Sequence, residues 1–419
     1  ETGETVFTGY SVSEDDVLIA KYRTIRFKGK ESLQIILDKT PFYAESGGQV
    51  GDTGFLIAGS EKIEIVDTVK ENNAIIHISH GKISSPQEMF HAVVDLKKRL
   101  MTASNHTATH LLHHALRKVL GSHVEQKGSL VTPERLRFDF SHFARLTREE
   151  IRKVEEEANQ MVRQSSNLTV VEGVPMEEAR QMGAIALFGE KYGDKVRVVS
   201  FGDSVELCGG IHAANTGRIG MIKITSENGI AAGIRRIEAV TAEKAEEYIN
   251  EKIEAADEVA FLLKSTGNIR ESVERMLAEN AQLRKTIEKF EAGSAMALIK
   301  DLEEKSGEIN GIRFISGVIE NGSAEMLKTI AHQIRSSSDN TVLVIGASSG
   351  DKANIFAMVS DSLVNSRNLS AVAIIKEISG EINGGGGGQP FLASAGGKNP
   401  SGLPAALSKA GEYLKKITS

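Results

Sequence analysis

Two short segments, about a hundred residues apart, hold side chains that could together bind one metal ion. His106 and His110 stand four positions apart in a stretch whose leucines repeat with helical period. Residues at i and i+4 lie on one helix face, so both imidazoles can reach one ion. Cys208 and His212 have the same spacing around a glycine pair, which favours a tight turn that brings thiolate and imidazole together. Three nitrogens and one sulfur are typical of tetrahedral Zn²⁺.

Simpler interpretations of these residues stay open. Two histidines on a leucine-rich helix are often only packed or solvated, and a cysteine commonly behaves as a small buried hydrophobe. A metalloprotease is disfavoured, because no glutamate follows His106 as in an HExxH motif. The chain has one cysteine, which excludes an internal disulfide and is typical of a reducing compartment. We therefore expect one Zn²⁺ and a cytoplasmic location.

The sequence around both segments resembles the editing domain of alanyl-tRNA synthetases. A glycine-rich string, TPFYAESGGQVGD at residues 40–52, stands upstream of the HTATHLL helix, as in that family. Further similar strings lie at residues 123–130, 135–142 and 229–239. The resemblance runs from about residue 7 to the C-terminus and is looser after Ser294. It implies the C-terminal half of the family's chain: an editing domain followed by a tRNA-binding domain.

The resemblance implies a hydrolase that removes a wrong amino acid, chiefly serine or glycine, from tRNA for alanine. Gln126 matches a position of the editing centre, where its amide would position water or the ester carbonyl, since an amide is no base at neutral pH. Zinc with an open position would generate hydroxide, whereas zinc with four protein ligands would hold the pocket in place, and the four candidates favour the second role. The expected substrate-binding residues are Gly47, Gly48, Gln49 and Arg235.

The helices and strands that we expect to position these residues indicate an α+β multidomain protein. Short β-branched runs between turn residues predict a β-barrel-like domain over 1–98. A zinc-containing α+β editing domain follows over 99–240, with the histidines on a helix from Lys98 to Leu120 and a strand over 129–140. The last two predicted regions are a helical coiled-coil segment over 241–304 and a small α/β domain over 305–419.

The coiled-coil segment carries apolar residues at intervals of three and four between Val273 and Phe290, which is a heptad seam. Asn280 occupies a core position of this seam, where a polar residue commonly fixes the register. We expect an antiparallel hairpin that turns at residues 265–268. Homodimerisation through the outer face of the hairpin is the alternative.

The C-terminal domain contains five consecutive glycines, at 384–388, which we expect to form a flexible loop rather than a phosphate-binding backbone. A nucleotide P-loop is disfavoured, because no Lys-Ser pair follows. The family commonly has an arginine where this chain has Gln389, so we expect no strong phosphate contact there. The resemblance implies that this domain binds tRNA, with Gly396, Gly397 and Lys398 as the candidate residues.

Composition limits the alternatives. A net charge of −6 argues against a protein that grips a long duplex along its whole surface, and no apolar run approaches the length of a membrane span. Motifs for ATP binding and amino acid activation are not seen, so we expect the ligase catalytic domain to be absent. The chain begins with Glu1, as in an excised fragment. The alternatives are a free-standing trans-editing deacylase and a non-catalytic tRNA-binding module with structural zinc.

Overall fold

The computed structural model describes residues 5–27, 30–72, 74–186, 193–320 and 322–419. The chain divides into two compact units, Glu1–Glu258 and Val259–Ser419, called unit 1 and unit 2 below. Each unit has its own apolar core, and each combines helices with β-sheet, as the α+β multidomain prediction requires. The finer division into four domains stays a prediction.

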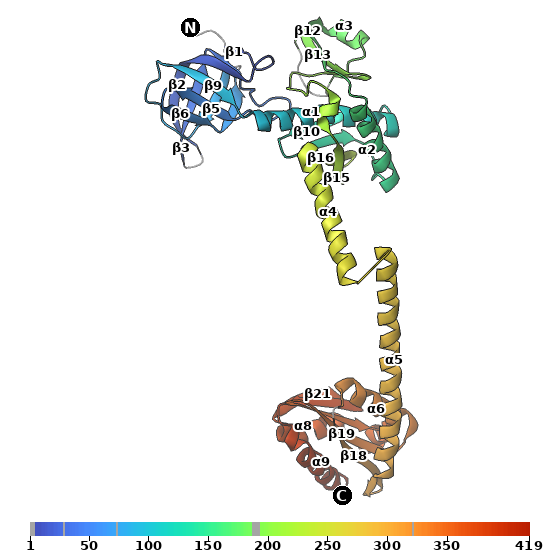
Figure 1. The fold of residues 1–419 in the computed structure, drawn as a ribbon. Coiled ribbons are helices and arrows are strands. Elements are labelled where there is room, and N and C mark those ends of the chain that lie inside the picture. Colours follow the sequence, from blue (N-terminus) through green and yellow to red (C-terminus); the bar gives the residue numbers. More distant parts are fainter. Residues whose placement is uncertain (1–4, 28–29, 73, 187–192, 321) are drawn as a thin grey trace. The chain divides into compact units, whose positions relative to one another are not determined.

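Unit 1 begins with a strongly bent antiparallel sheet of strand order β6-β5-β9-β2-β3-β8-β7 (Figure 1). Its interior is filled by Phe42, Leu56 and Phe90, none of which is exposed. β1 and β4 form a separate two-stranded parallel sheet. The strands are β1 (Val6–Phe7), β2 (Glu14–Phe27), β3 (Lys30–Leu37), β4 (Lys39–Thr40), β5 (Gly54–Ala58), β6 (Glu61–Ile65), β7 (Asp67–Glu71), β8 (Ala74–Ser79) and β9 (Met89–Val94).

The second part of unit 1 packs helix α1 (Leu96–Leu120) on an antiparallel sheet of order β10-β11-β16-β15. Asp95 caps the helix by accepting from the Lys98 N–H, and Gly121 ends it, close to the predicted bounds. A smaller sheet has the order β12-β13-β14. The remaining elements are β10 (Gln126–Val131), β11 (Leu136–Ser141), α2 (Arg148–Arg163), β12 (Thr169–Pro175), α3 (Met176–Gln181), β13 (Lys195–Phe201), β14 (Ser204–Leu207), η1 (Thr216–Ile219), β15 (Ile222–Ala231) and β16 (Ile234–Thr241).

The prediction of one strand over 129–140 was wrong, because β10 and β11 form a hairpin there. The hydroxyl of Thr132 accepts from the N–H groups of Glu134 and Arg135, and Pro133 has no N–H to donate to a ladder. The reversal places Gln126 opposite Phe140 on the neighbouring strand. It therefore decides where the candidate catalytic amide lies.

Unit 2 contains the end of α4 (Ala242–Leu262), the long helix α5 (Ile269–Glu304) and a mixed sheet of order β17-β18-β19-β20-β22-β21. Only the β18–β19 pairing is parallel among the described strands of this sheet. Helix α6 and the last turns of α5 cover one face, and α8 with α9 covers the other. The bounds are β17 (Gly307–Ile309), β18 (Ile312–Glu320), α6 (Ala324–Ser337), β19 (Thr341–Ser349), β20 (Lys352–Val359), α7 (Asp361–Arg367), α8 (Ala371–Ile378), η2 (Ser379–Ile382), β21 (Gly384–Gln389), β22 (Leu392–Gly397), η3 (Pro400–Gly402) and α9 (Leu403–Thr418).

The glycine run is not a flexible loop: it is the edge strand β21, paired along its length with β22. Glycine is required where the backbones approach closely, since a Cβ at Gly386 would collide with the Ser394 carbonyl oxygen. At Gly385, by contrast, a Cβ would meet open space. The loop prediction was wrong because the glycine content indicates only that the backbone can adopt many conformations. It does not indicate that pairing with β22 holds the backbone in one of them.

The helical segment is interrupted between α4 and α5, at the predicted turn. Asn268 caps α5 by accepting from the Arg270 N–H. The seam residues Met276, Leu283 and Phe290 are exposed. Packing of the two helices as a hairpin, and dimerisation, stay predictions. No helix in the described part of the chain is long and apolar enough to cross a membrane.

Candidate metal centre

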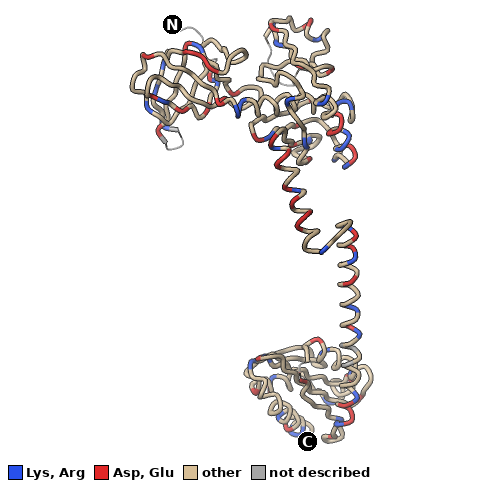
Figure 2. The backbone as a smooth tube through the Cα atoms, in the orientation of Figure 1, with Lys and Arg blue, Asp and Glu red and all other residues tan. Residues whose placement is uncertain are grey.

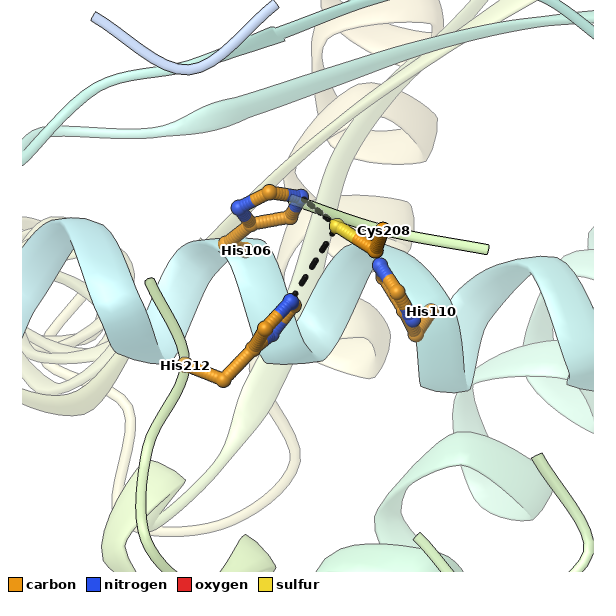
Figure 3. A group of neighbouring side chains, drawn as sticks. All are labelled: His106, His110, Cys208 and His212. Atoms are coloured by element: carbon orange, nitrogen blue, oxygen red, sulfur yellow. Dashed lines mark hydrogen bonds between the residues drawn. The ribbon is translucent and has the colours of Figure 1, made fainter. Parts of the chain in front are cut away.

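The predicted metal ligands converge in unit 1 (Figure 3). His106 and His110 project from α1, and Cys208 and His212 come from the loop after β14. The Cys208 Sγ lies 3.4 Å from the Nε2 of His106 and 3.3 Å from the Nε2 of His212. One donor atom from each of the four side chains lies within 4.8 Å of the others. Tetrahedral zinc with Zn–N of about 2.0 Å and Zn–S of about 2.3 Å places its donors about 3.5 Å apart.

The ring of His106 is oriented by Gln49. The Oε1 of Gln49 accepts from the Ile211 N–H at 2.9 Å and lies 2.7 Å from the Nδ1 of His106. An oxygen acceptor at Nδ1 requires a proton there, so the lone pair is left on Nε2, which faces Cys208. Gln49 thus joins the helix ligand to the loop that carries the other two ligands.

The other two imidazoles have oxygen partners at Nδ1 as well. The His212 Nδ1 lies 3.2 Å from the Thr107 hydroxyl, and the His110 Nδ1 lies 3.5 Å from a carboxylate oxygen of Glu206. Glu206 also accepts from the Nδ1 of His113 at 2.9 Å. Such partners fix the tautomer and the ring orientation of metal-binding histidines. Sequence reasoning missed Glu206, because an acidic residue inside a strand carries no metal-binding signal.

The loop that carries Cys208 is held by groups outside the ligand set. Arg197, on β13, donates to the carbonyl oxygens of Cys208 at 2.9 Å and Gly210 at 3.2 Å. The Tyr10 hydroxyl donates to the Gly209 carbonyl at 2.6 Å, and the Arg197 guanidinium lies 4.3 Å from the Tyr10 ring. A Cβ at Gly210 would collide with the His106 ring. Only glycine at this position therefore lets the loop lie this close to α1.

Burial sets the protonation of the site. It lowers the pKa of His106 and His212 well below the ordinary histidine value, and it lowers that of His110. For Glu206, burial alone would raise the pKa, but His110 and His113 outweigh it and the pKa is lowered. Neutral imidazoles beside an anionic carboxylate are the forms that bind and support a metal. The donor set and its surroundings therefore fit zinc.

A cavity of 580 Å³ opens beside this cluster. Gln126 and Gly47 line it, and the Gln126 Nε2 donates to the Ser129 Oγ at 3.3 Å. The Ser129 hydroxyl in turn donates to the Gly47 carbonyl at 3.3 Å. The lining residues are Thr5, Phe7, Tyr10, Tyr43, Ala44, Ser46, Gly47, Lys70, Ile75, His106, Thr109, His110, Gln126, Ser129, Glu206, Leu207, Cys208, Gly209 and Gly210.

The glycine pair beside the cavity docks the first sheet onto β10. Gly48 has a φ of +83°, and a Cβ there would collide with Ser129. Its carbonyl accepts from the Val131 N–H at 2.7 Å. Gln49 is 1% exposed and lies behind His106, outside the cavity lining. Its geometry supports a ligand-positioning role more than the predicted contact with substrate.

The remaining predicted residues are not among the residues that line the cavity. Arg235, on β16, donates through Nε to Glu227 at 2.6 Å, on the paired strand β15. Gly396 and Gly397 end β22 in unit 2, between β20 and β21, and Lys398 follows them. The roles of these residues in substrate and tRNA binding stay predictions.

Three family models match separate parts of the chain. One describes the threonyl and alanyl tRNA synthetase second additional domain and covers residues 196–238. Another describes class II (A) tRNA synthetases and covers 3–97, and the third, the DHHA1 domain, covers 311–416. The class II match coincides with the first sheet of unit 1, and the predicted absence of the ligase catalytic domain stays a prediction.

Curated relatives match nearly the whole chain. It is 44% identical to alanine–tRNA ligase of Cytophaga hutchinsonii over 99% of this chain and 48% of the relative. For the same enzyme of Bacteroides fragilis the identity is 48%, over 97% of this chain and 47% of the relative. The chain therefore spans about half the length of these relatives. The predicted resemblance to the C-terminal half of alanyl-tRNA synthetase is confirmed.

A solved structure also aligns with part of the chain. The C-Ala domain from Aquifex aeolicus alanyl-tRNA synthetase is 31% identical over 27% of this chain and 98% of its own length, with a TM-score of 0.25.

Proposed function

We propose that this chain hydrolyses the ester of tRNA for alanine that has been charged with serine or glycine. The observation that carries the proposal is the placement of Gln126 in one cavity with the candidate metal ligands His106, His110 and Cys208. A cavity of 580 Å³ has room for the terminal aminoacyl-adenosine of a tRNA. The sequence relationship to alanine–tRNA ligases supports the same substrate class.

A separate hydrolytic site meets a physical need in charging tRNA with alanine. A pocket built for alanine cannot exclude the smaller glycine, and it rejects one added hydroxyl poorly. A second pocket can hydrogen-bond that hydroxyl, so alanine would leave its polar groups unpaired. Ser46, Thr109 and Ser129 line the cavity, and their hydroxyls are candidates for this contact.

The protein's own groups can position the reacting ester and water. Gln126 is held by Ser129, so its amide would orient the carbonyl or the attacking water without taking a proton. His106, His110, Cys208 and His212 would hold the zinc, which when bound supplies positive charge that polarises nearby oxygens. Four protein ligands favour a zinc that shapes the pocket over one that carries the attacking hydroxide.

A deacylation assay with seryl-, glycyl- and alanyl-tRNA tests the proposal. We expect release of serine and glycine, with alanyl-tRNA largely spared. Gln126→Ala should keep the zinc and slow deacylation roughly tenfold to a thousandfold, as for the loss of an oxyanion donor. Equal rates for seryl and alanyl esters would refute the selectivity.

The four-ligand site favours one second candidate, a tRNA-binding module with structural zinc. It would bind mischarged tRNA without releasing serine, so the same assay separates the two. We further propose a cytoplasmic location and that unit 2 binds tRNA, through Gly396, Gly397 and Lys398 among other residues. Homodimerisation through the C-terminal half, and a free-standing trans-editing protein, stay open under this proposal.

A further inference from the structure

Lys70 is the one lysine or arginine among the described residues that line the cavity beside the metal cluster. It lies on β7, opposite Ile75 on β8, and Ile75 lines the cavity as well. The candidate metal ligands and Gln126 reach the same cavity from α1, β10 and the loop after β14. The lysine therefore faces the proposed reaction space from a different sheet.

The charge of Lys70 is not neutralised inside the cavity. Glu206 is the acidic residue among the described lining residues, and its carboxylate is already engaged by His113 and His110. No described acidic side chain forms an ion pair with Lys70, although Glu45, which is exposed, belongs to the neighbouring segment. Lys70 is exposed, so its ammonium group is accessible to an anion that enters the cavity.

The backbone that carries Lys70 is firmly held. Two residues earlier, Thr68 is fully buried, and its carbonyl accepts from the Glu45 N–H at 2.8 Å. Its hydroxyl donates to the Asp52 carbonyl at 2.8 Å. These contacts fix the end of β7 against the glycine-rich segment that lines the cavity. The backbone from which the Lys70 side chain extends is thus held in place.

The proposed substrate offers one kind of anion to this lysine. Its ester lies at the 2′ or 3′ oxygen of the terminal adenosine, and its negative charges are the phosphates of the strand. If the ester lies beside Gln126 and the metal cluster, the rest of the nucleotide extends along the cavity. Phe7 lies beside Tyr10 and Tyr43, and all three line the cavity and present aromatic surface suited to a base.

We propose that Lys70 binds the phosphate attached to the 5′ carbon of the terminal adenosine, an inference that rests on the proposed function. A lysine ammonium binds a phosphate oxygen as a point charge, with a charge-assisted hydrogen bond. The contact would anchor the terminal nucleotide and set how deeply the ester enters. Lys70 is in this sense a positioning residue for the substrate.

The experiment measures binding of two unreactive probes, in which serine is joined by an amide to 3′-amino-3′-deoxyadenosine, with and without a 5′-phosphate. Titration calorimetry on the full chain with zinc gives the ratio of the two affinities. We expect wild type to prefer the phosphorylated probe about fivefold to tenfold, as for one charge-assisted contact. Lys70→Gln should reduce this ratio to about one, and Lys70→Arg should restore part of it.

Lys82→Gln is the matched control, since Lys82 is an exposed lysine of the same sheet region outside the cavity lining, and it should keep the wild-type ratio. A wild-type ratio near one, or a ratio that Lys70→Gln leaves intact, would overturn the inference. The proposed function has its own readout, hydrolysis of seryl-tRNA by wild type. Failure of hydrolysis with a Lys70-dependent phosphate preference would remove the function while keeping the phosphate site.

Discussion

The interior of unit 1 contains charged and titratable side chains, whereas the interior of unit 2 is almost entirely aliphatic. In unit 1 the buried groups include Arg99 paired with Asp52, and Glu206 between two histidines. In the described part of unit 2 the buried polar side chains are hydroxyls, such as Thr341 and Ser360. Figure 2 shows that charged residues are spread along the chain in both units.

This difference indicates that unit 1 contains the groups that could carry out chemistry, whereas the interior of unit 2 serves stability. Burying a polar group costs free energy unless it is hydrogen-bonded, so a polar interior persists only as a connected network. In unit 1 the network runs from Gln49 through the metal ligands to Glu206 and His113. Unit 2 is stabilised by aliphatic side chains that are buried on both faces of its sheet. Reaction chemistry is therefore expected in unit 1 alone.

The largest expected effect comes from removing two metal ligands. Cys208→Ala with His212→Ala should bring zinc per chain close to zero and lower deacylation of seryl-tRNA by about a thousandfold or more, because the pocket loses its central support. Elemental analysis and the deacylation rate are the measurements. His332→Ala, which alters the one histidine of unit 2, is the control and should keep zinc and rate. Full zinc content in the double variant would contradict the metal site.

Acid should destabilise unit 1 before unit 2. Burial lowers the pKa of His77 from its ordinary value to about 4. Because the unfolded chain binds this proton more readily, stability falls as pH drops from about 6.5 to about 4 and then levels off, a loss of up to about 3 kcal/mol. Hydrogen exchange read segment by segment across this range measures the effect in each unit.

The control for the acid effect is His77→Gln, which removes the titrating group between Thr40 and the Ile35 carbonyl. This variant starts less stable but should lose less stability on acidification. No histidine is buried in the described part of unit 2, so no comparable loss is expected there. Equal acid sensitivity of the two units would remove the contrast drawn between their interiors.

A pair of glycine substitutions tests the edge strand of unit 2. Gly386→Ala should cost about 1–3 kcal/mol, since its Cβ collides with the Ser394 carbonyl and the strands must separate. Gly385→Ala has open space at the same strand and should change stability by less than about 1 kcal/mol. Urea unfolding of each variant measures both. Identical behaviour of the two would mean that β21 is not fixed against β22.

The smallest expected effect on chemistry comes from deleting residues 263–419, which keeps α4 whole. Cutting at 305 would separate Ala295 and Leu302 of α5 from the core of unit 2 in which they are buried. The deletion should raise the Michaelis constant for tRNA about tenfold and weaken its salt dependence, because phosphate contacts are lost. The rate at saturating tRNA should change little. Loss of that rate with unchanged tRNA affinity would place unit 2 in the active site.

The sequence by itself determined the candidate ligand set and the helix that carries half of it. Spacing of four on an apolar helix fixes two imidazoles on one face, which is a local property of α1. The end of this helix at Leu120, before Gly121, was also predicted from the sequence, whereas its start lies two residues before the predicted Lys98. Recognition of Gln126 came from the surrounding strings and not from any local physical pattern.

Only the tertiary structure decided what surrounds these ligands. Gln49, Arg197, Glu206 and Lys70 come from separate strands and loops, and no spacing in the chain relates them to His106. The structure of the glycine run could not be predicted from the sequence for the same reason. Its composition indicates which backbone conformations are allowed, whereas pairing with β22 selects one of them. Contacts between distant segments depend on the packing of whole sheets, and that packing is a property of the folded chain.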